Sequence, residues 1–404
     1  MSASAIRPSG IDGLATPSAF RTAVREWFDE HAPAKGSPQD FSAIHVVTST
    51  TKAEYRARER AALDVTRQWQ QKLYDAGLAG RSWPKEYGGA GAPVWQDDVV
   101  AEEQSRYGVS TKMMAVALEM VPPVLFVHGT HEQRLDHLPR VICGEETWCQ
   151  LLSEPGAGSD LASVSTLATP VDGGWSVTGQ KVWTSGAGSS DHALLIARTD
   201  RSVPGRGGLS CFAMPMAQPG VDVRPLRQMS GAYHFNEVFL DEAFVSKSRL
   251  IGELGGGWAV LRTMLRHERA AIGGGTSGRG AVQLVALARQ LEGNNDPLVR
   301  QTVAGVVARE RLLDLLQARM ASGPPVPAGG SVAKLLYSEH ARLTANAALE
   351  LLGVSAIGSA DATAEPWNER FLFAPGLRIG GGTDEIQRNT IAEWGLGLPR
   401  EPRS

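Results

Sequence analysis

The chain has 404 residues, a formal net charge of −3 and an isoelectric point near 6.3. This length can bury a large core and predicts two or three domains. The nearly balanced charge gives no general attraction to nucleic acid or anionic lipid, so neither is expected as a partner. The cysteines Cys143, Cys149 and Cys211 lack paired or metal-like spacing, which predicts no metal site and a reduced, cytoplasmic setting.

The amino-terminal part is predicted to be helical. Residues 1–17 have neither a basic region nor an apolar run, so we expect a disordered tail rather than a signal peptide. From residue 18 onwards the apolar residues recur at helical spacing, as in KAEYRARERAALDVTRQWQQKLYDAGL. The longest apolar run, residues 113–127, contains Glu119 and two prolines and is too short to cross a bilayer. We therefore assign residues 1–146 to a helical domain.

The pattern then changes twice. Residues 147–255 contain short β-rich runs separated by turn residues, such as GWSVTGQKVWTSG and HALLIARTD. In residues 256–404 long helical periodicity returns, as in SVAKLLYSEHARLTANAALELLG. The order helical, β, helical predicts an α+β fold in which a small sheet domain lies between two helical domains in the sequence.

Two familiar signals do not fit their surroundings. The glycines of residues 273–278 formally match G-x-G-x-x-G, but the segment before them is predicted to be a helix, which disfavours a dinucleotide-binding turn. His128, His131 and His137 lie close together in the sequence without an accompanying carboxylate pattern. We expect surface or capping histidines rather than metal ligands.

Two stretches of the β-rich part suggest a ligand site. LLSEPGAGSD, residues 151–160, runs from a strand into a turn with exposed N–H groups, which can hold an anion or the edge of a heterocycle. The alternative is an ordinary loop. GQKVWTSGA, residues 179–187, places Trp183 beside Thr184 and Ser185, which suits the face and edge of a flat ring. A core tryptophan is the alternative there.

Together with GGTDEIQRN, residues 381–389, these stretches resemble the acyl-CoA dehydrogenases, and the resemblance covers residues 18–400. It implies an N-terminal helical domain, a central β-barrel-like sheet domain and a C-terminal helical bundle. It also implies an FAD enzyme that dehydrogenates an acyl-CoA thioester and passes electrons to an electron-transferring flavoprotein or a similar acceptor. A flavin monooxygenase or oxidase on the same fold, and a supporting subunit without a base, are the alternatives.

The resemblance also implies cofactor contacts in three places. The first motif bonds the isoalloxazine and pyrophosphate, the second packs on the flavin and bonds its N5 side, and the third meets the ribityl and adenosine portion. The residues so assigned are Leu152, Ser153, Gly158, Ser159, Trp183, Thr184, Ser185, Thr383, Asp384 and Glu385. Ser159, Arg269 and Gly381 are expected to contact the substrate.

In the implied reaction a carboxylate removes the α proton while the β hydrogen leaves as hydride to flavin N5. Many family members place that glutamate where this chain has Gly381, whose N–H is implied to hold the thioester carbonyl. Other members place it at the position of Glu268, which shares an apolar helical stripe with Leu265. A carboxylate in such a stripe is costly unless paired or functional, and burial raises its pKa. We expect Glu268 to be the base; an ion pair with Arg269 or Arg262 is the alternative.

Two departures from the family affect the expected assembly. The resemblance implies a homodimer or a homotetramer, in which a neighbouring chain completes the FAD site. Residues 292–301 read EGNNDPLVRQ and lack the arginine-phenylalanine-glycine loop that meets FAD across the subunit boundary. Glu350 stands where a glutamine is frequent. A hetero-oligomer therefore remains open.

Overall fold

A computed structural model describes residues 11–14, 16–44, 51–274, 280–291, 296–356 and 363–400, except for the side chains of residues 270–274 and 321. The chain divides into two compact units, Met1–Met264 and Leu265–Ser404. Residues 1–10 of the expected tail lie outside the described residues. Ile11–Gly13, which belong to the predicted tail, form a turn of 3-10 helix in which Ile11 is buried.

The first unit begins with helices, as predicted. They are α1 (Pro17–His31), α2 (Lys52–Asp75), α3 (Trp95–Gln104), α4 (Val121–His128) and α5 (His131–Ile142), with a π-helix at Val116–Met120 before α4. Helices α1, α2 and α5 are capped by Thr16, Thr51 and Thr130, whose side chains accept a backbone N–H of the first turn. Phe28 and Trp69 are buried in the apolar core that α1, α2 and α3 share.

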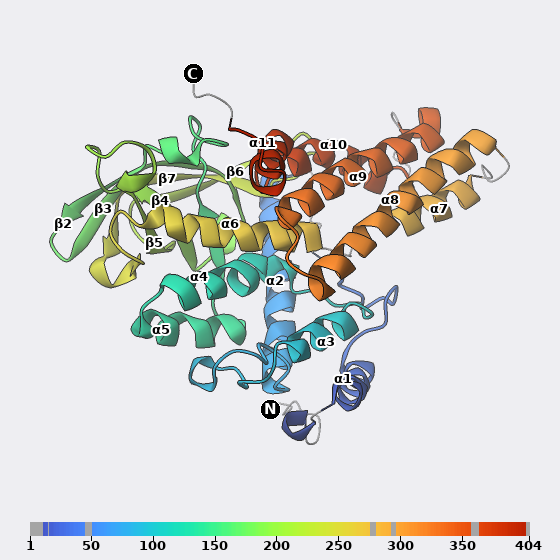
Figure 1. Cartoon of the computed structure of the whole chain (residues 1–404), viewed down its shortest axis with the longest axis horizontal. Helices are drawn as coiled ribbons and strands as arrows, with labels where there is room; N and C mark the ends of the chain where they lie inside the picture. The colour runs from blue at the N-terminus through green and yellow to red at the C-terminus, as the bar shows by residue number, and fades with distance from the viewer. Residues whose placement is uncertain are drawn as a thin grey trace. The chain divides into compact units, whose positions relative to one another are not determined.

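The same unit contains a sheet (Figure 1). Its strands are β1 (Trp148–Leu151), β2 (Leu167–Val171), β3 (Gly174–Ser185), β4 (His192–Arg198), β5 (Leu209–Pro215), β6 (Val221–Leu226), β7 (Phe235–Ser246) and β8 (Leu250–Ile251). The strand order is β6-β7-β3-β2-β4-β5-β8, and β1 lies parallel beside β4. These strands form the predicted central sheet domain. Val177, Leu195 and Phe212 are fully buried in its core.

The second unit is helical. Helix α6 (Gly257–Gly274) crosses the boundary between the units and confirms that the segment before residues 273–278 is not a strand. The other helices are α7 (Ala281–Gln290), α8 (Pro297–Ser322), α9 (Gly329–Leu352), α10 (Glu365–Ile379) and α11 (Asp384–Thr390), followed by a π-helix at Ile391–Gly395. Helix α9 packs against α7, α8, α10 and α11, and Figure 1 shows α8, α9 and α10 side by side. Leu284, Ala348 and Trp367 belong to their shared apolar core.

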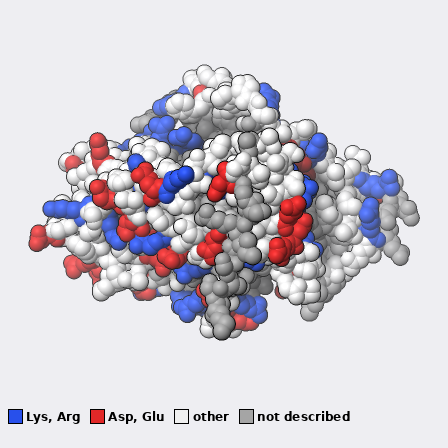
Figure 2. Space-filling model, turned by 90° about the horizontal axis from the view of Figure 1, so that it is seen from below, with Lys and Arg blue, Asp and Glu red and all other residues white. Residues whose placement is uncertain are grey.

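The surface of the chain carries both signs of charge. Figure 2 shows acidic and basic side chains interspersed over one face, with no extended patch of a single sign. Within the described part of the chain, none of the helices combines the length and the apolar character needed to span a bilayer.

Candidate active site

The turn after β1 is closed by its own backbone. Glu154 and Ala157 exchange two N–H···O hydrogen bonds of 3.0 Å each. A side-chain carbon added at Gly156 or Gly158 would meet nothing within 4 Å, and Ser159 is exposed. The main chain of this turn is therefore open to a ligand.

A buried lysine holds the turn in place. Lys181 of β3 has no exposed surface, and its Nζ donates to the Leu152 carbonyl and to Glu154 Oε1, both at 2.9 Å. Glu154 also accepts the backbone N–H groups of Ser165 and Thr166 at 2.6 and 2.9 Å. Burial opposes the charge of Glu154, but Lys181 and these hydrogen bonds lower the pKa of Glu154 to about 2. Burial lowers the pKa of Lys181 to about 8 despite the ion pair.

The two motif stretches of the β-rich part meet beside this pair. The Val182 N–H donates to the Ser153 carbonyl at 2.9 Å. Trp183 follows with φ of 63°, a left-handed conformation that is uncommon for a bulky residue, at a register shift between β3 and β7. Trp183 is 61% exposed, and its ring lies edge-on to the ring of Phe235, with the two ring centroids 5.9 Å apart. Trp183 is therefore not a core tryptophan.

The side chain that follows Trp183 is a hydroxyl group in need of a hydrogen-bond partner. Thr184 is buried, and its Oγ1 has no hydrogen-bond partner among the described residues. Its carbonyl accepts from Asn236 Nδ2 at 3.0 Å, which holds the backbone in place, and Ser185 is partly buried. A buried polar group without a partner costs about 1–3 kcal/mol, which a bound polar ligand could recover.

The glycine-rich turn of the second unit lies between α10 and α11. Gly381 and Gly382 have φ of 67° and 91°, left-handed values that favour glycine. Gln387 Nε2 donates to both of their carbonyl oxygens, at 2.9 and 3.1 Å. A Cβ at Gly382 would lie only 2.6 Å from that nitrogen. Thr383 caps α11 by accepting the Ile386 N–H at 3.2 Å.

Asp384, the first residue of α11, is 1% exposed, and its carboxylate accepts hydrogen bonds from neighbouring side chains. Its Oδ1 accepts from Lys334 Nζ at 3.0 Å and from Ser338 Oγ at 2.7 Å, and its Oδ2 accepts from Arg378 Nε at 2.7 Å. Burial opposes the charge of Asp384, but these three donors lower the pKa of its carboxyl. The side chain of Asp384 thus faces α9, whereas Glu385 remains exposed.

Glu268 lies on α6 within the second unit. It forms no hydrogen bond, and no ion pair within 4.0 Å, with any residue that the structure describes. Burial raises the pKa of Glu268 to about 7, and the charge of the adjacent Arg269 offsets only part of that effect. The ion pair considered with Arg269 is therefore not formed, and Arg262 is exposed to solvent.

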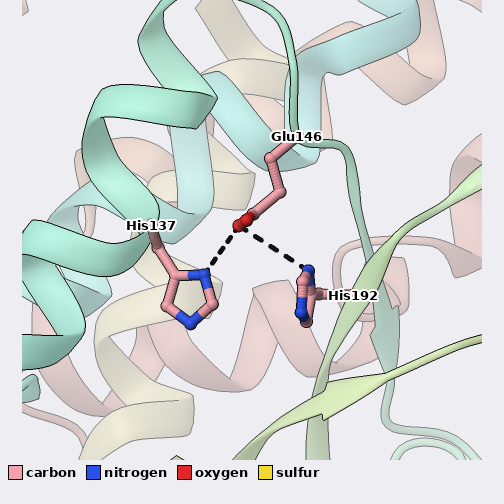
Figure 3. Close-up of side chains that lie close together, drawn as sticks. All are labelled: His137, Glu146 and His192. Atoms are coloured by element: carbon pink, nitrogen blue, oxygen red, sulfur yellow. Dashed lines mark hydrogen bonds and ion pairs between the residues drawn. The ribbon is translucent and has the colours of Figure 1, made fainter.

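A buried cluster in the first unit joins α5 to the start of the sheet (Figure 3). His137 Nδ1 lies 2.8 Å and His192 Nδ1 lies 3.7 Å from Glu146 Oε1. Trp148 Nε1 donates to the same oxygen at 2.6 Å, and Arg140 Nε donates to the other oxygen at 2.9 Å. The positive charge of Arg140 disfavours a metal cation there, so these contacts favour a structural role. The expected surface or capping position is wrong for His137, which is 2% exposed because it pairs with Glu146.

Three family models match most of the chain. They describe the N-terminal, middle and C-terminal domains of acyl-CoA dehydrogenases and match residues 16–145, 149–243 and 255–396. The chain belongs to the acyl-CoA dehydrogenase family. It is an oxidoreductase of an FAD-dependent family, and both the predicted family and the predicted α+β fold are confirmed.

Named relatives extend over the whole chain. Acyl-CoA dehydrogenase IpdE1 of Mycobacterium tuberculosis is 36% identical over 392 residues, covering 95% of this chain and 98% of the relative. The solved structure of the Tcur3481-Tcur3483 steroid ACAD has a TM-score of 0.77 and 26% identity, covering 99% and 100% of the two chains. The ChsE4-ChsE5 complex from Mycobacterium tuberculosis has a TM-score of 0.73 and 25% identity, covering 96% and 99%.

The residues that hold the two motif turns in this acyl-CoA dehydrogenase were not predicted from the sequence. Lys181 and Lys334 are both fully buried, although lysine is among the residues least often found in a core. Each lies in a predicted strand or helix next to apolar residues, such as Val182 and Leu335. A lysine within an apolar segment is the signal that could have found them.

Proposed function

We propose that this acyl-CoA dehydrogenase removes the α proton of an acyl-CoA thioester with Glu268 while the β hydrogen is transferred as hydride to FAD. The observation that carries the proposal is the unpaired state of Glu268, whose pKa is raised to about 7 by burial. A carboxyl group with that pKa is partly ionised at neutral pH and is basic enough to accept a proton from carbon. The carboxylates of Glu154 and Asp384, by contrast, form ion pairs with buried lysine side chains.

The first unit offers groups that fit a flavin. The exposed ring of Trp183 can pack on a flat ring system, and the unpartnered Thr184 hydroxyl can bond its edge. Leu152, Ser153, Gly158, Ser159 and Ser185 complete this proposed surface. When bound, FAD supplies the acceptor for the β hydrogen. In the second unit we assign FAD contacts to Thr383, the backbone of Asp384 and Glu385.

Substrate binding is assigned to the backbone as much as to side chains. The Gly381 N–H donates to no acceptor among the described residues, so it can meet the thioester carbonyl oxygen. Negative charge builds on that oxygen as Glu268 takes the α proton, and a fixed N–H donor stabilises it. Ser159 and Arg269 are the further proposed substrate contacts.

The base is tested by Glu268→Gln. This variant should retain FAD but lose about a hundred- to ten-thousand-fold in the rate of anaerobic flavin reduction by acyl-CoA. Glu365→Gln, which neutralises an exposed carboxylate of the same unit, is the matched control and should behave as wild type. Near-normal flavin reduction in Glu268→Gln would place the base elsewhere.

The name of one solved neighbour suggests the substrate. One solved neighbour is named a steroid ACAD, and on that basis we propose a bulky, ring-bearing acyl-CoA as the substrate of this chain. Anaerobic titration with straight-chain, branched and steroid acyl-CoAs, followed by bleaching of the flavin absorbance, identifies it. Bleaching by short straight chains alone would contradict the proposal.

We further propose assembly with other chains and electron transfer to an electron-transferring flavoprotein. A neighbour solved as the ChsE4-ChsE5 complex supports a hetero-oligomer, and the exposed Leu312 and Leu315 on one face of α8 offer an apolar contact surface. If light scattering showed a monomer that binds flavin fully, the proposed assembly with other chains would be contradicted. Rapid oxygen consumption during turnover would favour an oxidase instead.

A further inference from the structure

Lys334 is a fully buried lysine near the start of α9. Its Nζ donates to Asp384 Oδ1 at 3.0 Å and to the Arg378 carbonyl at 3.3 Å. A buried ammonium group without such partners loses several kcal/mol of hydration. The ion pair with Asp384 therefore explains why a lysine can occupy this position.

The contacts of Asp384 connect the three helices around the glycine turn. Ser338, one turn after Lys334 on α9, donates to Oδ1, and Arg378, in the last turn of α10, donates to Oδ2. Helix α10 ends directly before the glycines and α11 begins directly after Thr383. One carboxylate therefore ties both ends of the turn to α9.

Within the turn the carbonyl and N–H groups have different surroundings. Gln387 binds the carbonyl oxygens of Gly381 and Gly382 at 2.9 and 3.1 Å. The N–H groups of Gly381, Gly382 and Thr383 donate to no acceptor in the part of the chain that the structure describes. The carbonyl oxygens of the turn therefore already accept hydrogen bonds, whereas its N–H groups can donate to an oxygen atom of a ligand.

We propose that Lys334 and Asp384 are positioning residues that hold the glycine turn so that its N–H groups meet the thioester oxygen of the acyl-CoA. This rests on the proposed function, which takes the turn as a thioester-binding element. Misplacing a reacting group by about 1 Å can cost roughly a hundredfold in rate. Loosening Asp384 therefore slows the reaction even in a folded protein.

The first test compares Asp384→Asn with Leu313→Ala. Leu313 is a buried residue of α8 outside the Asp384 network, and its truncation costs about 2–5 kcal/mol of stability. Anaerobic flavin reduction, measured well below the unfolding temperature of each variant, should fall roughly 10- to 100-fold in Asp384→Asn. It should stay close to wild type in Leu313→Ala. Equal losses in the two variants, or wild-type reduction in Asp384→Asn, overturn the proposal.

A second readout needs neither turnover nor cofactor. In flavin-free protein, hydrogen exchange of the α11 amides should quicken in Asp384→Asn because α11 loses its anchor. Glu339→Gln is the matched control on α9, since it removes a carboxylate that binds Arg342 at 2.7 Å near the surface. Unchanged α11 exchange in Asp384→Asn overturns the proposal.

A third measurement separates this proposal from the assignment of the base. Binding of a non-reducible acyl-CoA analogue is measured in Glu268→Gln with and without Asp384→Asn. If Glu268 is not the base, Glu268→Gln reduces flavin normally, yet Asp384→Asn still weakens analogue binding. If only the positioning role is wrong, Asp384→Asn leaves analogue affinity unchanged while Glu268→Gln remains slow.

Discussion

The turn after β1 and the turn before α11 each contain an acidic side chain bound to a fully buried lysine. In the sheet, Lys181 binds Glu154 at 2.9 Å. Among the helices, Lys334 binds Asp384 at 3.0 Å. The remaining partners differ: Glu154 accepts two backbone N–H groups and the Ser165 hydroxyl, whereas all the other donors to Asp384 belong to side chains.

This difference follows from the surrounding secondary structure. The segment before β2 reaches Glu154 with N–H groups that are not used in the sheet ladder, so its carboxylate is held by main chain. Inside α9 the main-chain N–H groups are already bonded, and only side chains such as Lys334 and Ser338 can reach a neighbouring helix. The Glu154 carboxylate thus has backbone donors in addition to Lys181 and the Ser165 hydroxyl, whereas the Asp384 carboxylate depends on side-chain donors alone.

Removing one buried lysine is expected to have the largest effect on stability. Breaking a buried ion pair by deleting one partner costs about 3–5 kcal/mol. Lys181→Met leaves Glu154 without a cation, whereas in Lys334→Met the Arg378 guanidinium still binds Asp384. Urea unfolding should therefore show the greater loss for Lys181→Met. A greater loss for Lys334→Met would reverse the comparison.

The unpaired Glu268 should differ from the two paired carboxylates, Glu154 and Asp384, in how it makes stability depend on pH. Its pKa is raised from 4.5 to about 7, so between these values the folded state keeps a proton that the unfolded state has released. Its contribution to stability is complete below about pH 4.5 and is lost as pH rises through about 7, amounting to up to about 3 kcal/mol. Unfolding of wild type and Glu268→Gln should therefore diverge over that window, in favour of the variant at high pH. A pH-independent difference would contradict the raised pKa.

The strained tryptophan of the sheet region gives a smaller effect. Trp183→Ala and Trp183→Gly both remove the indole and should weaken flavin retention, measured by absorbance after gel filtration. Only glycine relieves the left-handed backbone, so Trp183→Gly should be more stable than Trp183→Ala by about 1–2 kcal/mol. If the flavin affinity and the flavin spectrum were unchanged in both variants, Trp183 would not belong to the cofactor site.

The smallest effect is expected for the amide inside the helical turn. Gln387→Met removes the donor to the carbonyl oxygens of Gly381 and Gly382 and should cost about 1 kcal/mol in thermal unfolding. Gln71→Met is the control, because the Gln71 amide binds the exposed Asp75 and contributes little. Equal losses would show that the turn does not depend on Gln387.

The sequence by itself determined the order of helical, β and helical parts, because apolar periodicity is a local property that follows from which face of each element is buried. It also located the turns that carry the motifs, since glycine and proline act on the backbone of their own positions. The domain boundaries predicted after residues 146 and 255 stay predictions, as do the cofactor and substrate residues. The role of Glu268 as the base also stays a prediction.

Only the tertiary structure decided which polar residues bind each other. Lys334 and Asp384 are fifty positions apart, and His137 meets His192 only because α5 lies against the start of the sheet. Helical or strand periodicity assigns a side chain to a face but does not say what the opposite face contributes. The pairing of a buried charge depends on groups brought together by packing, and its pKa and its role follow from them.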